Sequence, residues 1–129
     1  SYFKRVILMD IFPVRCEVEW AILESGIVEI SLDKNLSMIE QKVTRILGAP
    51  TFVRRPMDEM NSALWLLMDG SRSVRSIIEE MDEQFDEMIS PVNERVSRSI
   101  AQFVELGLVI LTRSENDFDW NIGPTEDLN

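Results

Sequence analysis

The fold of this chain is decided by residues Met57–Leu111, MDEMNSALWLLMDGSRSVRSIIEEMDEQFDEMISPVNERVSRSIAQFVELGLVIL. Three successive segments carry apolar residues at the spacing of one helix face, and a short apolar run follows them. Two turns, Asp69–Arg72 and Ile89–Pro91, separate the segments. The stretch therefore predicts three amphipathic helices and a final strand, with the look of a helix-turn-helix module. It contains no catalytic constellation, which favours a binding role.

A capping residue precedes each predicted helix. Asp58 can cap the first and Ser73 the second, while Ser90 can cap the third with Pro91 at its first helical position. The run Leu108–Leu111 predicts a strand in the place of a wing. The predicted inward faces are Met60, Ala63, Leu64 and Leu67, then Val74, Ile77, Ile78 and Met81, and then Val92, Val96, Ser99, Ile100 and Phe103.

Upstream of the helices, two alternating runs predict a hairpin. Residues 17–23 and 27–32 alternate apolar and polar side chains around a turn at Glu24–Gly26. A capping-box pattern starting at Ser37 then predicts a short helix over Met38–Leu47. The segment Thr51–Arg55 predicts a third strand, which pairs on one side only because Pro56 follows it.

Both ends of the sequence are harder to assign. The apolar run Val6–Phe12 fits either a strand or a short helix, and Pro13 is predicted to end it. From Ser114 onward the sequence is acidic and aperiodic, which predicts a loose tail. Phe118, Trp120 and Ile122 alternate with polar residues in this tail, so these side chains could dock on a neighbouring surface.

The composition narrows the classes of function. Of the 129 residues only Cys16 is a cysteine, which fits a reducing compartment, and none is a histidine. The commonest metal ligand and general base is therefore missing, and we expect no catalytic site, metal or cofactor. No segment has the ~20 apolar residues of a membrane span or the pattern of a signal peptide. A cytoplasmic protein without membrane contact is expected.

The net charge of −10 is unevenly distributed. Residues 1–55 hold eight Lys and Arg against seven Asp and Glu, whereas residues 56–129 hold five against sixteen. Nucleic-acid binders usually present a basic stripe that neutralises phosphates, and the helical half of this chain is acidic instead. The charge therefore argues against a nucleic-acid partner, and solubility is its simplest explanation.

The order of these elements and several short motifs resemble a known family. The motifs are Leu67-Met68-Asp69-Gly70-Ser71-Arg72-Ser73-Val74, Ile77-Ile78-Glu79-Glu80, Glu105-Leu106-Gly107-Leu108-Val109 and the run from Arg54 to Trp65. Over about residues 17–112 the chain is similar to PqqD, the D protein of pyrroloquinoline quinone synthesis. Members of that family also recognise ribosomally made peptides that are later modified.

The resemblance implies an α+β, winged helix-turn-helix-like fold. A three-stranded antiparallel sheet would pack on a three-helix bundle, with a short inserted helix and a C-terminal wing strand. Residues 17–112 would form this domain, with an insert at 35–50, an N-terminal extension at 1–16 and an acidic C-terminal tail at 113–129. The implied function is non-catalytic: the protein would bind a precursor's leader peptide as a chaperone and present it to a modifying enzyme, in this family often a radical S-adenosylmethionine enzyme.

Family members bind the leader along the third strand, in a cleft closed by the third helix. In this sequence the strand residues would be Phe52, Val53, Arg54 and Arg55, and the helix residues Arg95, Arg98 and Gln102. The two strand arginines could pair with leader carboxylates. Alternatively, they are solvated charges that protect an edge strand, while the helix arginines offset nearby acidic residues.

Two other functions are compatible with the predicted elements. One is a winged-helix transcription regulator that binds DNA through its third helix, Pro91–Leu106. That helix holds two Arg and two Glu and so has no basic face. The other is a scaffold whose helices form a homodimer. A gel shift tests the first alternative, and light scattering tests the second.

Overall fold

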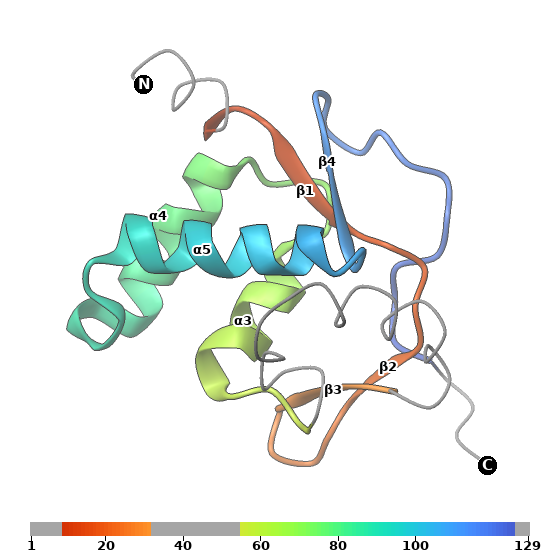
Figure 1. The fold of residues 1–129 in the computed structure, drawn as a ribbon, viewed down its shortest axis with the longest axis horizontal. Helices are drawn as coiled ribbons and strands as arrows, with labels where there is room; N and C mark the ends of the chain where they lie inside the picture. The colour runs from red at the N-terminus through yellow and green to blue at the C-terminus, as the bar shows by residue number, and fades with distance from the viewer. Residues whose placement is uncertain (1–8, 32–54, 126–129) are drawn as a thin grey trace.

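The fold is α+β, with helices and two small antiparallel sheets (Figure 1). It is described from a computed structural model over residues 9–31 and 55–125. The predicted helix Met38–Leu47 and all but the last residue of the predicted strand Thr51–Arg55 lie outside these ranges. The α+β class is confirmed, whereas the three-stranded sheet stays a prediction.

Helices α3 (Glu59–Leu67), α4 (Val74–Phe85) and α5 (Val92–Glu105) occupy the three predicted segments. The Asp58 carboxylate accepts a hydrogen bond from the Asn61 amide at 2.7 Å, and the Ser73 hydroxyl accepts one from the Ser76 amide at 3.2 Å. These contacts confirm two of the predicted caps, because each satisfies an amide that the first helical turn leaves free.

The predicted Ser90 cap on the third helix is wrong. A 3-10 turn, η2 (Asp86–Ile89), runs directly up to Ser90, whose amide donates to the Glu87 carbonyl at 3.2 Å. Pro91 follows in an extended conformation, and no side chain caps α5. Because the chain is still completing the preceding turn at Ser90, the helix begins at Val92 instead.

Strand β1 (Phe12–Arg15) pairs antiparallel with β4 (Val109–Thr112). Pro13 lies inside β1, opposite Leu111, so the prediction that it ends the element is wrong. The other edge of β1 meets the turn after α3. There the Arg15 amide donates to the Met68 carbonyl and the Gly70 amide donates to the Pro13 carbonyl, both at 3.0 Å.

Proline is tolerated at position 13 because the backbone nitrogen there points toward this turn and not toward β4, so the β1–β4 ladder loses no hydrogen bond. Continued pairing would direct an amide at position 13 to the Gly70 carbonyl. That carbonyl instead accepts from the Asn116 amide at 2.7 Å. The C-terminal segment thus supplies the donor that Pro13 lacks.

The predicted hairpin is confirmed as β2 (Trp20–Ile22) and β3 (Val28–Ile30). The chain also attaches this hairpin to α3, because the Val28 amide donates to the Ser62 hydroxyl at 2.8 Å and the Met57 amide donates to the Val28 carbonyl at 2.8 Å. The β2–β3 hairpin is therefore fixed to the helices even though it forms a sheet separate from β1 and β4.

Trp65 of α3 lies at the centre of the core. Its indole packs edge-on against Trp20, with ring centroids 5.7 Å apart, and in a tilted arrangement against Phe103, with centroids 5.5 Å apart. The hairpin, α3 and α5 therefore share one apolar core. Apolar side chains from the predicted inward faces are buried in it, namely Leu64, Val74, Ile77, Ile78, Met81, Val96, Ile100 and Phe103.

The segment from Asn116 to Thr125 docks on the domain, so the loose tail is wrong for these residues. The Trp120 indole donates to the Arg15 carbonyl at 2.7 Å, and the Thr125 amide donates to the Trp20 carbonyl at 2.8 Å. The Ile122 carbonyl accepts from the Trp20 indole at 3.2 Å. The alternation of apolar residues in this segment is consistent with docking, but the sequence does not indicate which backbone groups it contacts.

Candidate functional site

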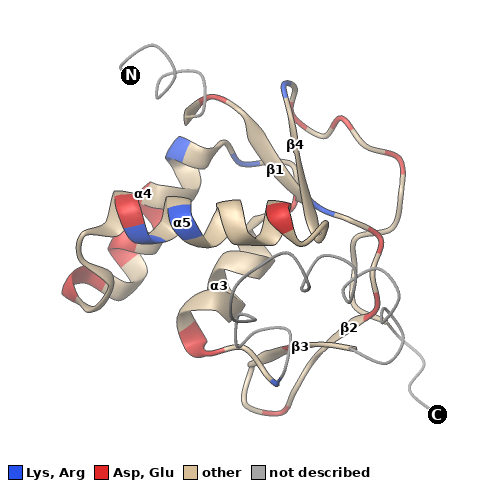
Figure 2. Cartoon of the chain, in the orientation of Figure 1, with Lys and Arg blue, Asp and Glu red and all other residues tan. Residues whose placement is uncertain are grey.

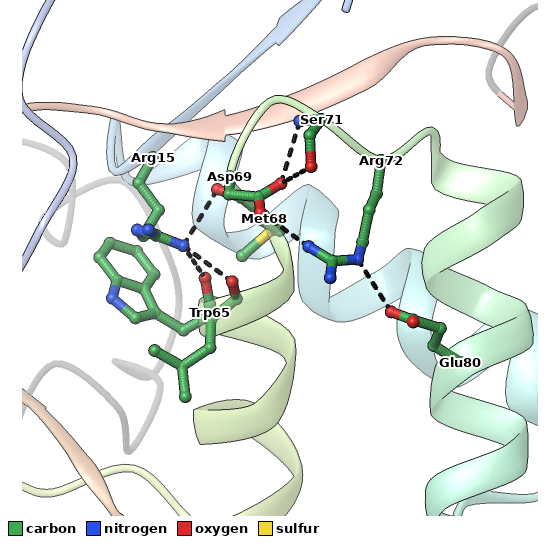
Figure 3. Close-up of polar contacts among 8 residues, drawn as sticks. Arg15, Trp65, Met68, Asp69, Ser71, Arg72 and Glu80 are labelled. Atoms are coloured by element: carbon green, nitrogen blue, oxygen red, sulfur yellow. Dashed lines mark hydrogen bonds and ion pairs between the residues drawn. The ribbon is translucent and has the colours of Figure 1, made fainter. Parts of the chain in front are cut away.

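A buried arginine of β1 connects the sheet to the end of α3 (Figure 3) and to the C-terminal segment. Arg15 is 6% exposed. Its Nη1 donates to three carbonyls at the end of α3, those of Trp65 at 2.7 Å, Leu66 at 3.1 Å and Met68 at 3.3 Å. Its Nε donates to the Ile122 carbonyl at 3.0 Å. Arg15 thus caps the carbonyls that a helix C-terminus leaves unpaired, where a cation is favoured.

Among the described residues, no carboxylate is in direct contact with the charge of Arg15. Burial lowers its pKa to about 10, and the nearby Asp69 carboxylate acts in the opposite direction. The guanidinium also lies over the Trp20 and Trp65 rings, 5.2 Å and 5.9 Å from their centroids. Because every donor contact is internal and the side chain is closed to solvent, we assign Arg15 to the architecture of the fold and not to ligand binding.

Asp69 organises the turn between α3 and α4. Its carboxylate accepts from the Ser71 amide at 2.9 Å, the Ser71 hydroxyl at 2.7 Å and Arg72 Nη1 at 2.7 Å. Arg72 Nε also pairs with Glu80 at 3.0 Å, which ties the turn to α4 (Figure 3). Burial acts to raise the pKa of Asp69, but the Ser71 hydrogen bonds and Arg72 outweigh it and lower the pKa below 3.8.

Replacing Asp69 with Asn should lower the free energy of unfolding by about 1–2 kcal/mol at pH 7, because charge-assisted hydrogen bonds are lost. The folded pKa lies below the unfolded one, so the stabilisation is complete above the unfolded pKa and is lost as the pH falls through the folded pKa. Urea unfolding of both proteins from pH 7 to pH 2 checks this. A difference that stays constant below pH 3.8 would contradict the assignment.

The surface of the described residues is hollowed beside α5. An apolar groove of about 310 Å³ lies where α5 approaches the start of α4 and the ends of β1 and β4. This volume is at the lower end of the range typical of ligand sites. The groove is lined by Ile11, Val74, Ser97, Ile100, Ala101, Val104, Glu105 and Leu111.

Strand β4 borders this groove with an edge that is open among the described residues. The Cys16 amide donates to the Leu108 carbonyl at 2.9 Å, which fixes the alternation of the β1–β4 ladder. In an antiparallel pair every second residue bonds across, so the backbone groups of Val109 and Leu111 face away from β1. Within residues 9–31 and 55–125 these groups meet no hydrogen-bond partner. The edge also exposes apolar side chains, since Ile110 and Leu111 are each 39% exposed.

An open edge beside an apolar groove can accept an extended chain. This geometry alone does not identify a protein family, and the comparisons with known proteins do not identify one either. Neither the protein-family models, nor the curated proteins, nor the solved structures contain a match to this chain.

Of the residues predicted from sequence for peptide binding, those that the structure describes do not line this groove. Phe52, Val53 and Arg54 lie outside the described ranges, and Arg55 is exposed. On α5, Arg95 donates to the Met88 carbonyl at 3.1 Å, Arg98 is exposed and Gln102 is half-buried. The predicted role of these residues stays a prediction.

Most of the groove and most of the predicted stripe follow different borders of the buried face of α5, although Arg98 and Glu105 lie about 20° apart on the helix. At 100° per residue, Arg95 and Gln102 follow one border of the buried face, and Ala101 and Val104 follow the other. The sequence signal for the groove was weak, because Ser97 and Ala101 are small residues on an otherwise charged surface. Ser97 and Ala101 become part of one site only because Leu111 lies beside them, and Leu111 is positioned by its pairing with β1, a strand that the sequence did not assign.

The described charges on α4 and α5 are predominantly acidic or mixed in sign (Figure 2). Acidic side chains predominate on α4, and α5 carries Arg95 and Arg98 together with Glu94 and Glu105. Among the residues described, no group of three metal-binding side chains comes together. No helix in the same part of the chain is long and apolar enough to cross a membrane.

Proposed function

We propose that this protein binds an extended peptide as an additional strand on β4, without catalysing a reaction on it. The observation that carries the proposal is the open edge at Val109 and Leu111 beside the apolar groove. Main-chain hydrogen bonds to such an edge provide affinity for any extended segment, and pockets for alternate side chains provide selectivity. The groove is placed to receive those side chains, because Leu111 belongs to both the edge and the groove.

The resemblance to PqqD supports a role in presenting the peptide. A leader peptide held on one edge leaves the rest of its precursor free for a modifying enzyme. Our proposal places the peptide on β4, whereas the resemblance implies the strand at Thr51–Arg55. The two sites use different residues and can be separated by mutation.

Electrostatics disfavour the DNA-binding alternative. A helix that enters the major groove must approach phosphates, and proteins do so with clustered Lys and Arg. The exposed surface of α5 instead mixes two arginines with two glutamates, and α4 beside it is acidic. An apolar groove and an open strand edge also contribute nothing to phosphate contacts.

Replacing Leu111 with Pro should weaken peptide binding about tenfold, because one peptide carbonyl loses its main-chain donor at a cost of about 1.4 kcal/mol. The fold should persist, since this amide faces away from β1 and proline is tolerated on edge strands. The probe is a fluorescent library of strand-length peptides that alternate apolar residues with Ser, Thr, Lys or Glu. Binding is measured by anisotropy.

Two controls make this test specific. Leu111→Val retains the amide and should weaken binding less than about threefold, consistent with the loss of one buried methylene. Met88→Ser removes an apolar side chain that is 74% exposed and distant from the groove lining, and should have no effect. If Leu111→Pro and Leu111→Val bind the library equally, the added strand does not lie on β4. If the wild-type protein binds none of it, the proposed function is wrong.

A further inference from the structure

One charged residue stands out in the apolar groove. Glu105 is the only ionisable side chain among those that line it. At the opposite end, the nearby charges of Asp10 and Arg75 neutralise each other in an ion pair at 3.4 Å. Within the described ranges, Glu105 forms no ion pair or side-chain hydrogen bond. The groove therefore presents a single uncompensated negative charge to whatever enters it.

Glu105 also occupies an electrostatically unfavourable position in its own helix. It is the last residue of α5, where the unpaired carbonyls make the helix end negative and a cation is preferred. Arg98, on the same helix, is seven residues away and not at the three- or four-residue spacing that brings side chains together. Sequences that break a local rule without compensation often do so at a functional site.

We infer that the peptide bound at β4 is cationic, with a Lys or Arg side chain placed against Glu105 and apolar side chains in the groove. This inference rests on the proposed function and names its ligand class. An ammonium or guanidinium group at the end of α5 would pair with the carboxylate and with the negative helix terminus at once. The acidic character of this half of the chain, with sixteen acidic against five basic residues from position 56 onward in the sequence, would steer such a peptide toward the protein.

The inference accounts for the shape of the site as well as its charge. In an added strand, side chains alternate between the two faces of the sheet. Those on the same face as Leu111 would enter the groove beside Ile11 and Val104, while a long basic side chain at the α5 end could lay its methylenes on the apolar surface and extend its charge to Glu105.

A charge exchange tests this inference. Two peptide libraries alternate the same apolar residues with Ser and Thr, and one contains Lys where the other contains Glu. The wild-type protein should bind the Lys library about three- to tenfold more tightly, the effect of one partly exposed ion pair. Glu105→Lys should reverse the preference. That variant should fold, because a cation suits the end of α5.

A matched variant separates local from overall charge. Glu83→Lys on α4 makes the same change in net charge away from the groove, and it should leave the preference within about twofold. If Glu83→Lys alters the preference as much as Glu105→Lys, the effect is one of overall charge and the inference is wrong. If the wild-type protein binds both libraries equally, the inference fails while the proposed function stands. If it binds neither, the proposed function itself fails.

Discussion

Replacing Arg15 with Met should lower the free energy of unfolding by about 3–5 kcal/mol, because several charge-assisted hydrogen bonds of about 1.5–3 kcal/mol each are lost while the desolvation cost of the buried guanidinium is recovered. Methionine retains most of the buried volume but donates no hydrogen bond. The carbonyls of Trp65, Leu66, Met68 and Ile122 would each lose a charged donor. Those of Trp65, Met68 and Ile122 would keep one neutral donor each, from the Met68 amide, the backbone amide of residue 15 and the Trp20 indole. The contacts with the Trp20 and Trp65 rings would lose their electrostatic part. Urea unfolding at pH 7 measures the effect.

Arg15→Lys should also destabilise the protein, by about 2 kcal/mol, because one ammonium cannot reproduce the planar fork that reaches α3 and Ile122 together. The matched control is Arg95→Ala, which removes an exposed arginine bonded to one carbonyl and should change stability by less than about 0.5 kcal/mol. A fully stable Arg15→Met protein would show that the desolvation of the buried charge cancels its hydrogen bonds.

Replacing Gly70 with Ala should destabilise the fold by about 2–4 kcal/mol, from backbone strain and overpacking together. Gly70 has a φ of +82°, in the left-handed region that a side chain disfavours. An added Cβ would also lie 2.6 Å from Cε1 of Phe118, closer than atoms can approach. The C-terminal segment would therefore have to move, and the bond from Asn116 to the Gly70 carbonyl would be disturbed. Thermal and urea unfolding both report the loss.

Gly26 provides a control for the strain alone. Its φ is +88°, but an added Cβ would meet nothing within 4 Å, so Gly26→Ala should cost only about 1–2 kcal/mol. Introducing Gly70→Ala into a Phe118→Ala background should reduce its cost to nearly that of Gly26→Ala, because the clash is then removed. If the cost of Gly70→Ala is the same with and without the Phe118 ring, the docked position of the C-terminal segment is wrong.

The helices were predictable because their signals are local. Apolar spacing identified each buried face, and Asp58 and Ser73 satisfy amides only three residues away. The exception was Ser90, where the same local pattern was overridden by the 3-10 turn before it. A cap is decided by the conformation of the chain that enters it, which the pattern of residue types does not contain.

The sheet formed by β1 and β4 could not be predicted because its determinants are distant in sequence. A proline normally ends a strand. Pro13 is accepted in β1 only because its backbone faces the turn after α3, where the Gly70 carbonyl receives its hydrogen bond from the Asn116 amide instead. The burial of Arg15 likewise depends on carbonyls 50 and 107 residues away. The candidate groove shares this origin, because Leu111 and Ile11 become neighbours only when the two strands pair.

The span of these contacts has a consequence for the order in which the chain can fold as it leaves the ribosome. Arg15 and Ile122 are 107 residues apart, and β1 meets β4 only after about a hundred residues more have been translated. Until then Arg15 lacks the Ile122 carbonyl that its Nε contacts, and β1 has an unpaired edge on which nascent chains can associate. Completion of the domain is therefore expected to be slow and late, since closing so large a loop precedes the contacts that reward it.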